Sequence, residues 1–189
     1  MDRREFVKRA GVGSVGLGAL AASPVALAGR PGFPKGGGHQ HFTLVALSRA
    51  APVGDGIDHM MILEGSGTFK ASPGHADGGG NFIHFDFAAP GTSPIASGKW
   101  EVTDFLSYST PVGDYGRIRA SIVTVRVELQ PDAGGSLAGT LLVACNVGFV
   151  PLLTGQPEGF KLSVDGSLDF NAPFLGLTHI GIPEGESSA

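Results

Sequence analysis

The chain of 189 residues has one cysteine, one tryptophan and few charged side chains, which make up 16% of the total. A single cysteine, Cys145, cannot form a disulfide within the chain, and it lies too far from the N-terminus to anchor a lipid. In an alternating strand, Leu141, Val143, Val147 and Phe149 share its face. We therefore predict that Cys145 is buried in apolar surroundings and chemically unreactive.

The chain also lacks any concentration of one charge. It has 13 basic and 17 acidic residues, scattered along the sequence, for a formal net charge of −4. This pattern excludes the basic patch that nucleic acids and anionic membranes require. After residue 28, no run approaches the roughly 18 apolar residues that cross a bilayer. We expect no nucleic-acid partner and no membrane span in that part of the chain.

The first 28 residues carry the most specific pattern in the sequence. The adjacent Arg3 and Arg4 precede a weakly apolar, glycine-rich run over residues 10–22, and Ala26-Leu27-Ala28 forms a small-x-small cleavage site. This segment closely resembles a twin-arginine (Tat) signal peptide. The resemblance implies that the Tat machinery exports the protein already folded. The expected location is periplasmic, at the cell surface or extracellular.

The remaining sequence predicts one antiparallel β domain. We assign residues 29–40 to a linker rich in proline and glycine, 41–183 to the domain and 184–189 to a disordered tail. Apolar and polar residues alternate with period two between turn signals, with no helical pattern. We expect strands at 41–48, 59–70, 81–87, 99–108, 116–129, 136–149, 160–164, 167–170 and 175–182. The longest loops, at 72–80, 88–98 and 151–159, are the expected places for function.

Glycines inside long strands favour an antiparallel barrel of about eight strands, because a closed sheet must bend. A β-sandwich is the alternative. The stretch Glu64-Gly65-Ser66-Gly67-Thr68-Phe69 resembles the strand ends of the allene oxide cyclase and dirigent barrels. That resemblance implies a barrel and transfers no catalytic residue.

All six histidines follow residue 28, and neutral imidazole suits zinc, copper, iron and nickel. A metal site built from several strands would use His59, His75, His84 and His179. A cupin site is not expected, because Leu44 and Val45 stand where the cupin motif after His39-Gln40-His41 requires a glutamate. Calcium in the glycine turns at 55–58 and 77–81 is a further alternative. The sequence requires no cofactor.

Asp104 interrupts an apolar face in a predicted strand. Trp100, Val102, Leu106 and Tyr108 would share that face, and an inward carboxylate must be paired. We predict an ion pair with Arg119, ahead of Arg117, unless a bulge near Ser121 turns both arginines outward. The candidates for lining a ligand pocket are Phe82, Trp100, Asp104, Tyr108 and Arg119; Phe69 is a further aromatic that could face a cavity.

Nothing in the sequence marks an activated serine or a phosphate loop. An exported barrel of this size can hold one small ligand. The sequence therefore favours non-catalytic binding of a small apolar or amphipathic molecule over catalysis. A metal-dependent or cyclase-like enzyme and a cell-surface structural or accessory module are the alternatives.

Overall fold

The computed structural model describes residues 38–50, 59–86, 93–109, 114–115, 118–146 and 154–182. The expected signal peptide, most of the expected linker and the expected tail lie outside these residues. Among the described residues, no helix has the length and apolar character needed to cross a membrane.

The described chain is all-β and antiparallel, as the alternating sequence predicts. Its strands are β1 (Gln40–Arg49), β2 (His59–Lys70), β3 (His75–Asp86), β4 (Ala96–Ser109), β5 (Asp114–Tyr115), β6 (Ile118–Arg119), β7 (Ser121–Pro131), β8 (Leu137–Cys145), β9 (Gly159–Val164), β10 (Asp169–Phe170) and β11 (Ala172–Gly181). All eleven join one sheet in the order β10-β9-β8-β7-β4-β3-β2-β1-β11-β6-β5. A sandwich would need two separate sheets.

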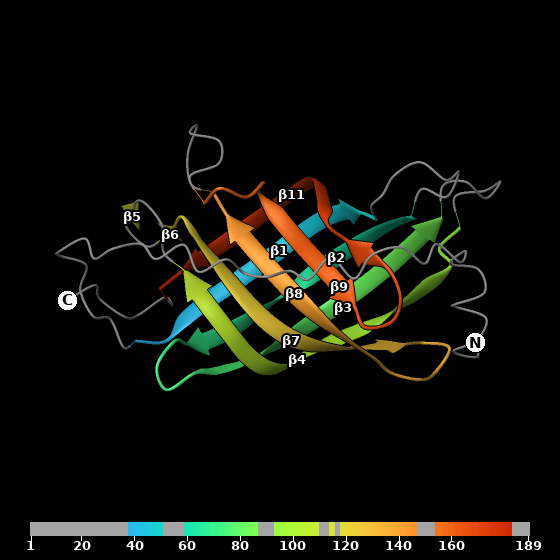
Figure 1. Cartoon of the computed structure of the whole chain (residues 1–189), viewed down its shortest axis with the longest axis horizontal. Helices are drawn as coiled ribbons and strands as arrows, with labels where there is room; N and C mark the ends of the chain where they lie inside the picture. The colour runs from blue at the N-terminus through green and yellow to red at the C-terminus, as the bar shows by residue number, and fades with distance from the viewer. Residues whose placement is uncertain are drawn as a thin grey trace.

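This sheet curls strongly on itself, so that β8 and β9 lie across from β1 and β11 (Figure 1). Alternate side chains of the long strands point into the space between the two sides. On β7, Val123, Val125, Val127 and Leu129 are all at most 2% exposed. The core that fills this space is continuous from β1 to β10. Burial of these faces is the main driving force for the curled sheet.

Two register shifts in β4 move Asp104 away from the predicted apolar face. They lie between Val102 and Asp104 and between Phe105 and Ser107, and each changes which side chains point inward. Asp104 is exposed, and its carboxylate accepts the main-chain N–H of Phe105 at 2.8 Å. The prediction that Asp104 lies inside the sheet is therefore wrong, because the bulges in β4 turn its side chain to the surface.

Residues 75–80 form the first half of β3, although the sequence predicted a loop at 72–80. Gly80 pairs with Gly65 of β2, and an added Cβ at Gly80 would lie 1.9 Å from the main-chain oxygen of Glu64. Here the two strands approach more closely than side chains allow. The glycine run is therefore a site of close backbone packing, and the turn is limited to residues 71–74.

Other strand boundaries differ less from the predictions. The expected strand at 116–129 is divided into β6 and β7, and the two-residue β5 was not predicted. Cys145, at the end of β8, is 2% exposed, which confirms its predicted burial. Burial also raises the pKa of its thiol to about 11. The thiol donates to the main-chain oxygen of Thr178, with a Sγ–O distance of 3.4 Å.

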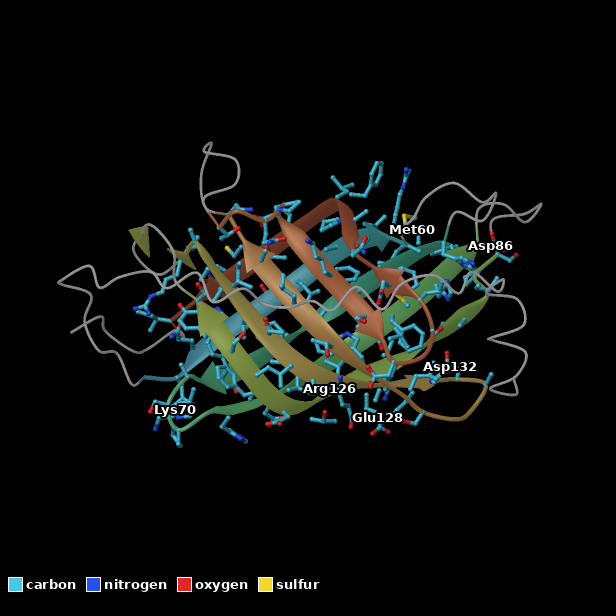
Figure 2. The ribbon with its side chains drawn as sticks, viewed as in Figure 1. Met60, Lys70, Asp86, Arg126, Glu128 and Asp132 are labelled. Atoms are coloured by element: carbon cyan, nitrogen blue, oxygen red, sulfur yellow. The ribbon has the colours of Figure 1, made fainter. Side chains whose placement is uncertain are left out.

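The two ends of the molecule are conveniently named after residues labelled in Figure 2, where Lys70 lies at one end and Asp86 at the other. At the Lys70 end, β2 passes into β3. At the Asp86 end, β2 begins, β3 ends and β4 begins. Asp132, in the turn between β7 and β8, also lies toward the Asp86 end.

Side chains, rather than paired strands, connect β11 to the ends of β8 and β9. Glu158, just before β9, accepts both the main-chain N–H and the hydroxyl of Thr178 through Oε1, at 3.0 and 2.7 Å. Its Oε2 accepts the main-chain N–H of Asn146, and the single hydroxyl proton of Thr178 is shared between Glu158 Oε1 and the main-chain oxygen of Ala144, which lies 2.6 Å from the hydroxyl oxygen. We call this group of contacts the seam.

Candidate functional site

A pocket of about 320 Å³ opens at the Asp86 end of the curled sheet. The start of β4 forms one wall, and the turn between β7 and β8 forms the other. The lining residues are Pro94, Ile95, Ala96, Ser97, Pro131, Asp132, Ala133, Gly134, Gly135, Ser136 and Leu137. The mouth of a curled β-sheet is a common position for a ligand site.

The pocket has an apolar floor and a polar rim. Ala96 and Leu137 pack against the core, so the floor continues the apolar interior. Asp132 joins the two walls: its carboxylate accepts the hydroxyl of Ser97 at 2.7 Å, and its N–H donates to the main-chain oxygen of Ser97 at 2.8 Å. The pocket is therefore held open by fixed contacts and offers a carboxylate beside apolar surface.

A buried pair of histidines lies beside this pocket. His59 and His84 are 3% and 1% exposed, and Nδ1 of His59 is 3.0 Å from Nε2 of His84. The main-chain oxygen of His84 accepts the N–H of Ile95, a pocket residue, at 2.8 Å. Burial, and then the neighbouring His59, lower the pKa of His84 to about 3, against a smaller raising effect of Asp86. His84 is thus neutral at ordinary pH.

The four predicted metal ligands do not come together. His59 and His84 meet at the Asp86 end, whereas His179 meets His41 on β1, with 3.2 Å between Nδ1 and Nε2. His75 is exposed at the Lys70 end of β3. In the part of the chain that the structure describes, no three His, Cys, Asp or Glu side chains form a group able to hold a metal.

The predicted calcium turns are also accounted for. Residues 77–81 belong to β3 and pair along their length with β2. They therefore form a strand, and the prediction of a glycine turn at 77–81 is wrong. The other stretch, 55–58, lies outside the described residues.

The aromatic pocket candidates lie in the core. Phe82 and Trp100 are 4% and 1% exposed, as is Phe69 at 1%, and all three pack within one cluster. The indole N–H of Trp100 donates to the main-chain oxygen of Glu64 at 3.1 Å, across the glycines of β2 and β3. None of these side chains lines the pocket at the Asp86 end.

Tyr108 and Arg119 do come together, at the opposite end. Burial raises the pKa of the Tyr108 hydroxyl, while the neighbouring Ser121, Arg119 and Gln40 partly oppose that rise. The ring of Tyr108 packs 4.9 Å from that of Phe69. Asp104 is exposed and is not part of this cluster. The predicted set of five is thus divided among the core, the Lys70 end and the surface.

Sequence reasoning missed the pocket because its residues read as turns. Residues 88–98 and 131–135 carry proline, glycine and aspartate, which predict loops and hairpins. One available signal was Ile95, a large apolar side chain inside an expected surface loop. Apolar residues in such loops often cover or line a ligand site.

Comparison with known proteins gives no match: no family model fits the chain, and neither a curated protein nor a solved structure is significantly similar to it.

Proposed function

We propose that this protein is exported by the Tat machinery and binds a small amphipathic molecule in the mouth of a closed β-barrel. Export rests on the Arg3-Arg4 pattern and the cleavage site after it. The binding role rests on one observation, the pocket at the Asp86 end.

The seam supports closure of the barrel. Glu158 and Thr178 connect strands at the two sides of the curled sheet, and Thr178 also reaches the main-chain oxygen of Ala144. These side-chain contacts cover facing edges of the sheet, and covered edges protect an exported protein from aggregation through them. Side chains fill the interior of this barrel along most of its length, so its mouth is the place where a ligand can bind.

The pocket's chemistry supports an amphipathic ligand. Its volume of about 320 Å³ is at the lower end of the range for ligand pockets and suits a small molecule. Ala96 and Leu137 would contact the apolar part of that molecule, and the carboxylate of Asp132 would attract a cationic or hydrogen-bond-donating head group. Because Ser97 already holds Asp132 in position, this carboxylate is preorganised.

Filling the pocket tests the proposal. Ala133 is exposed on the pocket wall, so Ala133→Trp adds bulk there without entering the core. The probe is N-phenyl-1-naphthylamine, whose fluorescence rises in an apolar site. We expect saturable binding by the wild type and at least tenfold weaker binding by Ala133→Trp.

Ala71→Trp is the matched control, because Ala71 is exposed in the turn at the Lys70 end, far from the pocket. It should bind the probe like the wild type. Circular dichroism should show the same fold in all three proteins. Absence of saturable binding by the wild type, or equal affinities for Ala133→Trp and the wild type, would remove the pocket as the site.

A further inference from the structure

We propose that His59, His84 and Met61 bind a single Cu(I) ion at the Asp86 end. This inference is independent of the proposed ligand binding, because none of the three side chains lines the pocket.

The two imidazoles have a spacing that fits one metal ion. Nδ1 of His59 and Nε2 of His84 are 3.0 Å apart. If a metal lay at a typical metal–imidazole distance of about 2.0–2.1 Å from each nitrogen, the N–metal–N angle would be about 95°. That angle suits three- or four-coordinate binding and excludes a linear two-histidine site, so a third ligand is needed.

Met61 is the third ligand that the strands supply. It is the direct cross-strand partner of His84. It also follows His59 by two residues, so the two side chains share one face of β2. Direct partners have Cβ atoms about 4.5–5.5 Å apart, and the methionine side chain has three rotatable bonds with which to place its sulfur. Met61 is 2% exposed, and its side chain packs in the hydrophobic core.

This ligand set selects Cu(I). Thioether sulfur is a soft ligand that favours Cu(I), and imidazole accepts copper equally well. Asp86 is near the pair, but among the described residues it does not form with His59 and His84 a group able to hold a metal, so the ligand set lacks the carboxylate that zinc or a harder ion would take. The ring of Phe170 packs at 87° and 5.2 Å from that of His84, which gives the site an apolar neighbour. A buried single charge costs less there than a double charge.

Asp86 supplies the balancing charge. It is the cross-strand partner of His59, and it interacts electrostatically with His84. A carboxylate close to the ligands, but outside the group that could bind the ion directly, stabilises a monovalent cation at this position.

The test is an anaerobic titration of the whole purified protein with Cu(I) in competition with the chromophoric chelator bicinchoninate. The wild type should take up one equivalent. His84→Asn and Met61→Leu should each weaken binding by at least tenfold. Met60→Leu is the matched control, because Met60 is also buried but pairs with Phe85 and not with His84, and this variant should bind like the wild type.

X-ray absorption of the loaded wild type should show both nitrogen and sulfur neighbours, and the sulfur signal should disappear in Met61→Leu. Leucine nearly conserves the volume of methionine, so this variant remains informative even if His84→Asn fails to fold. The proposal is overturned if the wild type takes up no stoichiometric Cu(I), if Met61→Leu binds as tightly as Met60→Leu, or if Zn(II) displaces Cu(I) at equal concentration.

Discussion

At the scale of single residues, burial has opposite effects on the pKa values of His84 and Cys145. It lowers the pKa of His84, because the charged imidazolium is the form that loses solvation. It raises the pKa of Cys145, because there the charged form is the thiolate. Each shift leads to a measurable behaviour of the folded protein.

His84 should make the fold sensitive to mild acid. Its pKa falls from 6.5 to about 3 on folding, so between these values the unfolded chain binds a proton that the folded chain does not. The free energy of unfolding is therefore unaffected above pH 6.5 and falls with decreasing pH below it, by up to about 1.4 kcal/mol per pH unit. From pH 7 to pH 5 this amounts to about 2 kcal/mol.

Urea unfolding with a metal chelator present measures this loss. His84→Asn should show a pH 7 to pH 5 loss that is smaller by that amount. Equal losses in the wild type and in His84→Asn would show that His84 accepts its proton in the folded state.

The thiol of Cys145 should react slowly. With a pKa of about 11 instead of 9, its thiolate fraction at pH 8 is about a hundredfold lower than in the unfolded chain, and burial restricts access further. Labelling with a chromogenic disulfide reagent should be at least that much slower in the native protein than in urea. Equal rates would contradict the buried position.

Cys145 could be predicted from the sequence because its own strand alternates regularly. The histidine pair could not, because His59 and His84 belong to different strands. Which histidines meet depends on the register between β2 and β3, and the sequence does not state that register directly. The same reason explains why His179 meets His41 and not the other predicted ligands.

At the scale of elements, the glycine pairing of β2 and β3 determines how closely the strands approach. An added Cβ at Gly80 would meet only main-chain atoms of β2, which cannot rotate away. Gly80→Ala should therefore lower the free energy of unfolding by about 3 kcal/mol. Ser66→Ala, an exposed change on the facing strand, should change it by less than about 0.5 kcal/mol.

Denaturant unfolding of Gly80→Ala, Ser66→Ala and the wild type measures these differences in the free energy of unfolding. If Gly80→Ala were as stable as Ser66→Ala, the two strands would not be in the close contact that the structure shows.

Alternation predicted the type of nearly every strand but not where the alternation is interrupted. In β4 the pattern shifts at two bulges, so Asp104 was assigned to the wrong face. In β3 the run Gly78-Gly79-Gly80 was read as a loop, since glycine weakens an isolated strand. Its strand form depends on glycines in the neighbouring strand, which is information from a distant part of the sequence.

At the scale of the whole molecule, the seam connects β11 with the ends of β8 and β9. Glu158 accepts three donors, two of them main-chain N–H groups. Glu158→Gln keeps the shape but replaces one accepting oxygen by a donating NH₂ group, which leaves a donor facing a donor. We expect the free energy of unfolding to fall by about 1–3 kcal/mol. A variant as stable as the wild type would show that the seam contributes nothing to closure.

Export also concerns the whole molecule. Arg3→Lys combined with Arg4→Lys keeps the charge of the N-terminal segment but removes the arginine pair on which Tat recognition rests. We expect the precursor to accumulate in the cytoplasm, as judged by fractionation and immunoblotting. Normal export of the double variant would refute a twin-arginine signal.

The seam also predicts where the folded molecule opens. Ladders of main-chain hydrogen bonds join β11 to β1 and β7 to β8. By contrast, the Glu158 carboxylate, the Thr178 hydroxyl and the Cys145 thiol connect β11 with the ends of β8 and β9. The amide hydrogens of Thr178 and Asn146 should therefore exchange with solvent much faster than those at the centre of β1 or β7. Fluctuations of this kind would let water reach the core along β11 first, well before the sheet as a whole comes apart.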